Sequence, residues 1–137
     1  MSKIYLSWED VEHLVGELCK QIQVRRKWTP YSPFKRVHGL QRGGFIPAVM
    51  ISHKLNIPYA DDPTRWGDEC LIIDDICDSG ETLEGWTDHI TAVLHHKPHT
   101  ACVTPTMYGK LHKGDEWIIY PWEAKNSKTI QDYKLDN

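Results

Sequence analysis

The sequence has 137 residues, of which 40% are hydrophobic and 26% are charged, and its formal net charge is −3. This length and balance are typical of one globular domain with a single core. The charges form no basic stripe that would neutralise a run of phosphates, which argues against a nucleic-acid partner. The sequence shows neither a signal peptide nor an apolar stretch of membrane-spanning length, so we expect a soluble, cytoplasmic protein without a membrane partner.

The first half of the chain alternates between strand and helix patterns. A short β-prone run at residues 4–6 precedes Ser7 and Asp10, which form a helix-capping pattern. Apolar residues at helical spacing then predict an amphipathic helix over residues 11–22. The next expected elements are a strand at 37–40, a Gly-Gly turn, a helix from Pro47 to Leu55 and a strand at 57–59.

The second half continues this alternation after a polar loop at residues 61–68. Apolar residues between Leu83 and Leu94 recur at helical spacing and predict a helix that ends near residues 95–98. Alternating strands and helices favour an α/β fold, with a mostly parallel central sheet covered by helices on both faces. We expect this single domain to span residues 1–125 and a polar tail to span 126–137. The remaining predicted strands are 70–73, 101–104 and 117–119.

The cysteines and histidines give no sign of a disulfide or metal framework. The four cysteines lie at wide, irregular spacings without a Cys-x-x-Cys pair, so we interpret them as small apolar core residues. None of the eight histidines has the HExxH spacing that places two ligands on one helical face. We therefore expect the histidines to lie on the surface.

The most informative segment is an apolar strand that ends in two acids and leads into a turn of small polar residues. Ligands of open α/β sheets bind beyond the carboxyl ends of the strands. Backbone N–H groups of the turn, a helix amino terminus behind them and the hydroxyls of Ser79 and Thr82 would hold a phosphate. Asp74 or Asp75 would reach sugar hydroxyls or a Mg²⁺-bound ligand. A plain helix cap after an exposed strand end is the alternative interpretation. The segment reads Leu71-Ile72-Ile73-Asp74-Asp75-Ile76-Cys77-Asp78-Ser79-Gly80-Glu81-Thr82-Leu83.

This pattern resembles the phosphoribosyl-pyrophosphate (PRPP) motif of type I phosphoribosyltransferases. The resemblance implies that Asp78 accepts a proton near the base nitrogen and that Asp74 and Asp75 hold Mg²⁺. The upstream segment Arg42-Gly43-Gly44 resembles the pyrophosphate loop of that family, with Arg42 and Gly43 as the binding residues. The residues that the resemblance assigns to the ribose and the 5′-phosphate are Asp74, Asp75, Asp78, Ser79, Gly80, Glu81 and Thr82.

Residues 117–123 resemble the carboxyl-terminal region of bacterial xanthine-guanine phosphoribosyltransferases, where a Trp stacks on the purine. The resemblance implies that Trp117 offers its face to the base while main-chain groups around Ile118 read the base edge. Glu123 matches a late acid that helps to position a metal. A core role for Trp117 is the alternative. The segment reads Trp117-Ile118-Ile119-Tyr120-Pro121-Trp122-Glu123.

Two features depart from that family. The family carries a Lys before a Pro, on the strand after the motif helix, which reads the purine 6-oxo group. Alignment through Pro105 places Thr104 at that position, with Lys110 or Lys113 as possible substitutes. The family also carries a long mobile loop that closes over the reaction centre, and the corresponding stretch before Cys70 has only about ten residues.

The resemblance implies a glycosyltransferase of purine salvage that moves phosphoribosyl from PRPP to guanine, xanthine or hypoxanthine, uses Mg²⁺ and forms a dimer or tetramer. Two alternatives stay open. The short loop and Thr104 suggest a non-catalytic regulatory protein of the same fold that binds PRPP or a nucleotide. A receiver-like signalling domain also uses an acidic pair in an α/β sheet, but places that pair near the first strand.

Overall fold

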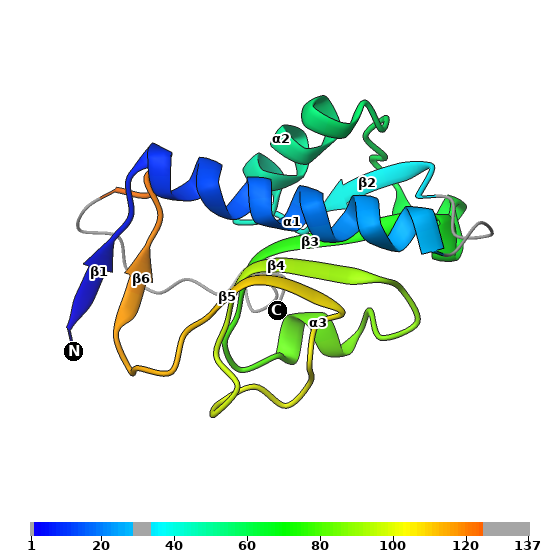
Figure 1. Cartoon of the computed structure of the whole chain (residues 1–137). Coiled ribbons are helices and arrows are strands. Elements are labelled where there is room, and N and C mark those ends of the chain that lie inside the picture. The colour runs from blue at the N-terminus through cyan, green and yellow to red at the C-terminus, as the bar shows by residue number, and fades with distance from the viewer. Residues whose placement is uncertain (1, 29–33, 125–137) are drawn as a thin grey trace.

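The computed structural model describes residues 2–28 and 34–124 (Figure 1). The predicted tail at 126–137 lies outside the described residues. Within the described part, no helix is long and apolar enough to cross a membrane. The elements in chain order are β1 (Lys3–Tyr5), α1 (Trp8–Trp28), β2 (Arg36–Gly39), α2 (Phe45–Leu55), the 3-10 helices η1 (Pro63–Arg65) and η2 (Gly67–Glu69), β3 (Cys70–Cys77), α3 (Glu81–Glu84), β4 (Thr91–His96), β5 (Met107–Leu111) and β6 (Trp117–Ile119).

Four strands form a parallel sheet in the order β2-β3-β4-β5. Its central strands β3 and β4 are buried along almost their whole length, as parallel strands covered on both faces usually are. The helices α1 and α2 lie on one side of this sheet, whereas α3 lies on the other (Figure 1). The predicted α/β fold with a mostly parallel sheet flanked by helices is confirmed.

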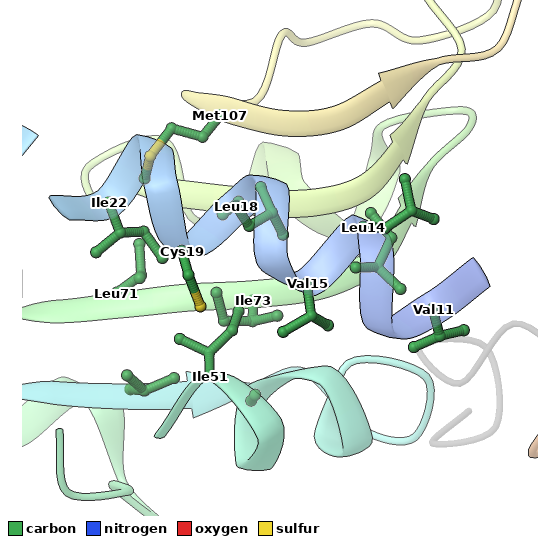
Figure 2. Close-up of a cluster of buried hydrophobic side chains, with 14 of the residues drawn as sticks. Val11, Leu14, Val15, Leu18, Cys19, Ile22, Ile51, Leu71, Ile73 and Met107 are labelled. Carbon is green, nitrogen blue, oxygen red and sulfur yellow. The ribbon is translucent and has the colours of Figure 1, made fainter. Parts of the chain in front are cut away.

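The first helix begins with the predicted cap. Ser7 Oγ accepts a hydrogen bond from the Asp10 N–H at 3.0 Å, and Asp10 Oδ2 accepts one from the Ser7 N–H at 2.9 Å. The apolar side of α1 points towards Leu71 and Ile73 of β3 and Ile51 of α2 (Figure 2). This packing forms the larger core. The buried residues of α1 are Val11, Leu14, Val15, Leu18, Cys19 and Ile22.

Strands β1 and β6 form a separate two-stranded parallel sheet in which Ile4 pairs with Ile118. This small sheet lies beside the amino-terminal end of α1, at one end of the molecule (Figure 1). The Leu6 N–H extends the pairing by donating to the Ile119 carbonyl at 2.9 Å. Both strands were predicted, but their pairing was not. Their pairing brings residues 117–119 to a fixed place beside the main sheet.

Two predicted elements are wrong. The helix α3 ends at Glu84 before Gly85, and residues 91–96 form the buried strand β4 instead of continuing a helix. Residues 101–104 contain no strand, and the last strand of the main sheet is β5. The predicted strand at 57–59 is reduced to a single bridge between Tyr59 and Val37.

The cysteines and histidines follow the expectations only in part. Cys19, Cys70 and Cys77 are buried as predicted, whereas Cys102 is exposed. The surface prediction is wrong for His95 and His96, which are 4% and 3% exposed. Both belong to β4, the strand that the helical spacing concealed.

Candidate active site

The glycine turn between β2 and α2 lies directly against β3. The Leu40 N–H donates to the Ile73 carbonyl at 2.8 Å, which ties the turn to the strand. A Cβ atom on Gly43 would collide with the carboxylate of Asp75, and one on Gly44 would collide with the Ile73 carbonyl. Adjacent glycines therefore allow the close approach that brings the two sequence motifs together.

Asp74 and Asp75 lie inside β3, which continues to Cys77 instead of ending before the acids. Asp74 is only 8% exposed, and its Oδ1 accepts a hydrogen bond from the Asp75 N–H at 2.9 Å. Asp75 is half-buried, and its Oδ1 accepts from the Ile76 N–H at 2.8 Å. Main-chain donors thus hold both carboxylates, and the Asp75 carboxylate lies beside Gly43 of the glycine turn.

The turn after β3 depends on Gly80, which has a φ of 83°. A side chain there would be strained by this left-handed conformation and would crowd the Cys102 main chain at 3.0 Å. Ser79 Oγ accepts a hydrogen bond from the Glu81 N–H at 3.3 Å, while Glu81 and Thr82 are exposed. Because α3 has only four residues, the donors available to a phosphate are those of the turn itself, rather than those of the long helix that was predicted.

Asp78 contacts a buried lysine that the sequence analysis did not select. Lys97 follows β4 directly and is 4% exposed. Its Nζ lies 3.5 Å from Asp78 Oδ2 and donates to the Glu116 carbonyl at 2.9 Å. Asp78 Oδ1 also accepts from the Thr100 hydroxyl at 2.9 Å. The carboxylate and carbonyl therefore fix the buried ammonium group at the carboxyl end of the sheet.

Trp117 completes this cluster, because the Lys97 Nζ lies 5.9 Å from the centroid of its ring. The Trp117 N–H donates to the Ser2 carbonyl and the Ile119 carbonyl accepts from the Leu6 N–H, on either side of β1, so the N–H and carbonyl of Ile118 point away from β1. The Ile118 side chain is buried in the core, which leaves its main chain as the part that could meet a ligand. The structure thus brings Asp78, Lys97 and Trp117 together.

Thr104 is not placed where the sequence alignment required. It is exposed and lies in a stretch without a strand. The strand after the motif helix is β4, and the residues that follow it are Lys97 and Pro98. The Lys-Pro pair of the family pattern is therefore present at 97–98. Its signal was visible in the sequence, but the helical spacing up to Leu94 hid the strand before it.

Glu123 lies shortly after β6 and is held by Tyr120. Its carboxylate accepts a hydrogen bond from the Tyr120 N–H at 2.8 Å. Burial raises the pKa of Glu123, and the negative charge of Asp75 raises it further, whereas the Tyr120 N–H and the charge of Arg42 oppose the rise. The two acids and Arg42, an exposed residue of the glycine turn, are therefore close enough to affect one another electrostatically.

The predicted metal ligands Asp74, Asp75 and Glu123 supply oxygen atoms, which Mg²⁺ prefers. Among residues 2–28 and 34–124, no group of three or more His, Cys, Asp or Glu side chains is arranged to hold a metal. Mg²⁺ is commonly bound by one or two carboxylates together with the phosphates of a substrate. These residues therefore fit an ion that arrives with a phosphorylated substrate.

One cavity of about 490 Å³ lies elsewhere, between the second half of α1 and the start of β5. None of the predicted site residues lines it. Because it lacks acids, we assign the chemistry to the converging motifs rather than to this cavity.

The chain is similar in sequence and fold to known proteins. The xanthine-guanine phosphoribosyltransferase of Idiomarina loihiensis is 23% identical to this chain, in an alignment that covers 88% of this chain and 87% of that protein. The enzyme of the same name from Cereibacter sphaeroides is 27% identical and covers 66% of this chain and 70% of its own length. The crystal structure of a purine phosphoribosyltransferase from Pyrococcus horikoshii matches with a TM-score of 0.72 and 28% identity, over 96% of this chain and 100% of that chain.

The chain is similar to purine phosphoribosyltransferases. No protein-family model matches it. Its parallel sheet and flanking helices have the type I phosphoribosyltransferase fold, and its PRPP-type turn follows β3. The candidate site has two sides: the glycine turn with Asp75, and the cluster of Asp78, Lys97 and Trp117.

Proposed function

We propose that the protein is a PRPP-dependent purine phosphoribosyltransferase. It would transfer the phosphoribosyl group from PRPP to a ring nitrogen of a purine base and release pyrophosphate. The observation that supports this most is the meeting of Asp78, in the PRPP-type turn, with Lys97 and Trp117. A sugar-phosphate motif and an aromatic platform with a fixed ammonium group match the two substrates of that reaction.

The PRPP side of the site rests on β3 and the two turns. In this proposal Asp74 and Asp75 orient the ribose and the Mg²⁺ that PRPP brings with it. The N–H groups of residues 79–82 and the hydroxyls of Ser79 and Thr82 bind the 5′-phosphate. Arg42 and the Gly43 N–H bind the pyrophosphate, and Arg42 stabilises the negative charge that develops on it as it leaves. Glu123 helps to hold the same ion.

The base side accounts for a preference among purines. Trp117 stacks on the ring, and the main chain at Ile118 reads the base edge. The Lys97 ammonium group can only donate, so it favours a 6-oxo acceptor over the 6-amino group of adenine. Asp78, held beside Lys97, accepts the proton that the base nitrogen loses as the new bond forms. We assign the role first expected of Thr104 to Lys97.

A panel of bases tests the proposal directly. The protein with PRPP and Mg²⁺ should form nucleotides from guanine, xanthine or hypoxanthine, and much less from adenine. Asp78→Asn should abolish most of this activity, whereas Asp68→Asn, an exposed residue of η2, should leave it unchanged. Nucleotide formation confined to pyrimidines would contradict the assignment of Trp117 and Lys97.

A second candidate function is a non-catalytic protein that binds PRPP or a nucleotide. The stretch that the family uses as a mobile loop here forms η1 and η2, and η1 packs beside β2. The Arg36 guanidinium lies 4.0 Å from the centroid of the Trp66 ring, and the Lys35 N–H donates to the Glu69 carbonyl at 2.9 Å. Calorimetric binding of PRPP without nucleotide formation from any base would favour this candidate.

Two other expectations stay predictions. The cytoplasmic location is expected from the sequence pattern alone, whereas assembly as a dimer or tetramer is implied by the family resemblance. Sedimentation of the purified chain at several concentrations would measure the oligomeric state. The relatives found are phosphoribosyltransferases, which disfavours the receiver-like alternative.

A further inference from the structure

Tyr120 links the two acids on the pyrophosphate side of the site. It is 2% exposed, and its hydroxyl donates to the main-chain carbonyl of Asp75 at 3.1 Å. Its N–H donates to the carboxylate of Glu123 at 2.8 Å. Trp122 stacks on the Tyr120 ring with centroids 4.9 Å apart and planes at 3°. One rigid, buried residue therefore sets the position of Glu123 relative to the end of β3.

His95 fixes the hydroxyl of Tyr120. Its Nδ1 lies 2.8 Å from that hydroxyl. A hydroxyl has one hydrogen, so the His95 tautomer with its proton on Nδ1 is the one that leaves the Tyr120 hydrogen for the Asp75 carbonyl. Burial, together with the charges of His112, Lys110 and Lys97, lowers the pKa of His95 to about 4, so the ring is neutral near pH 7. His95, Tyr120 and the Asp75 carbonyl thus form a directed chain of hydrogen bonds.

We propose that Tyr120 is a positioning residue for PRPP binding and that His95 holds its hydroxyl in place. This inference rests on the proposed function. Tyr120 bonds to both acids, through its hydroxyl to the Asp75 carbonyl and through its N–H to the Glu123 carboxylate, so its position sets their separation. Removal of the hydroxyl leaves the buried Asp75 carbonyl and His95 Nδ1 without this partner, and the end of β3 can relax.

The purine side is anchored differently. Lys97 is held by Asp78 and the Glu116 carbonyl, and Trp117 is held by its pairing with β1. Removal of the Tyr120 hydroxyl should therefore weaken the binding of PRPP and its ion more than the binding of the base. Substitution of a residue with a purely structural role would weaken the binding of both substrates to the same extent.

The first test is Tyr120→Phe. The KM for PRPP and the calorimetric Kd for magnesium-PRPP should rise about ten-fold, while the KM for the purine and kcat change by less than about two-fold. The matched control is Tyr108→Phe, because the Tyr108 ring contacts His96, with centroids 5.5 Å apart, and packs against a separate core cluster that contains Ile72 and Val93. This control should leave both constants unchanged.

The second test uses His95. His95→Leu removes the donor to Tyr120 and should weaken magnesium-PRPP binding as much as Tyr120→Phe does. His95→Asn offers an amide N–H near the position of Nδ1 and should restore most of the affinity. The Tyr120→Phe/His95→Leu double variant should bind no more weakly than either single variant, because both break one hydrogen-bond chain.

The outcomes separate this inference from the proposed function. Equal losses for PRPP and purine, or unchanged binding of magnesium-PRPP by a folded Tyr120→Phe variant, would overturn the positioning role. A wild-type protein that binds magnesium-PRPP but forms no nucleotide would overturn the proposed enzyme, while the calorimetric comparison would still decide the role of Tyr120. A folded wild-type protein that does not bind magnesium-PRPP would overturn both. Circular dichroism checks folding in each case.

Discussion

In the proposed function, the buried ammonium group of Lys97 is the fixed hydrogen-bond donor on the base side of the site. A buried ammonium group is costly unless it is paired, and here a carboxylate and a carbonyl compensate it. Such a group keeps a fixed position, whereas an exposed lysine samples many rotamers. A fixed donor discriminates between acceptor and donor groups on a base better than a mobile one does.

Lys97→Met should therefore lower kcat/KM for guanine or xanthine by about 10- to 100-fold, because a charge-assisted hydrogen bond to the 6-oxo group is lost. The KM for PRPP should change much less. Lys110→Met, on the exposed part of β5, is the control and should leave the kinetics unchanged. Steady-state assays with each substrate varied in turn measure both effects. A similar loss in the Lys110→Met variant would contradict the role of Lys97.

Gly43 offers a second test at a single residue. Gly43→Ala should weaken magnesium-PRPP binding by about ten-fold or more, because the new Cβ displaces the Asp75 carboxylate. Gly16→Ala on α1 is the matched control, since a Cβ there meets nothing within 4 Å. It should keep normal binding and stabilise the protein by about 0.5–1 kcal/mol through helix propensity. Calorimetry and thermal unfolding separate the two effects.

At the scale of elements, the sequence was informative where local pattern and fold agree. The cap at Ser7 and the apolar face of α1 were both correctly predicted, because a helix on a sheet buries one stripe. The buried strand β4 was missed, since its continuous apolar run also fits helical spacing. Two signals favoured a strand: Gly85, which interrupts the helical pattern, and the short length of the apolar stretch in β4.

That single error moved the predicted base-reading position from Lys97 to Thr104. The last strand of the sheet was also predicted at the wrong place. The sequence of β5 is polar and partly exposed, so it gave no clear strand pattern. The contact between Tyr120 and Asp75 had no local signal at all. It joins residues 45 positions apart, and only the packed fold brings them together.

The small sheet of β1 and β6 makes a prediction about dynamics. A two-stranded sheet is marginally stable alone, whereas β3 and β4 lie in the centre of a larger sheet. Amides of residues 117–119 should therefore exchange with solvent at least about ten-fold faster than those of β3. Addition of a purine nucleotide should slow exchange at 117–119 preferentially. Hydrogen exchange followed by mass spectrometry tests this, and uniform exchange in the two sheets would contradict it.

For the whole molecule, parallel pairing explains why the site forms at one edge. The strands β3 and β4 run in the same direction, so Asp75, Asp78 and Lys97 come from the carboxyl ends of neighbouring strands or just beyond them. The same topology makes both strands buried on two faces, and it places two histidines of β4 in the interior. Stability and site geometry are thus set by the same strands.

Burial of His95 makes the stability of the whole protein depend on pH. The pKa of His95 is lowered from 6.5 to about 4, so below pH 6.5 the unfolded chain takes up a proton that the folded protein does not. Stability should therefore fall as the pH decreases from about 6.5 to about 4, by up to about 3 kcal/mol from this group. Burial also lowers the pKa of His96, which adds a contribution of the same sign.

Urea unfolding at a series of pH values measures this dependence. The His95→Asn variant should show a shallower decline between pH 6.5 and pH 4 than the wild type, because the asparagine does not titrate and only His96 continues to contribute from β4. His13→Asn, on the exposed side of α1, should keep the wild-type slope. An unchanged slope in the His95→Asn variant would mean that His95 takes up its proton equally in the folded and unfolded chain, which is incompatible with a neutral donor buried beside Tyr120.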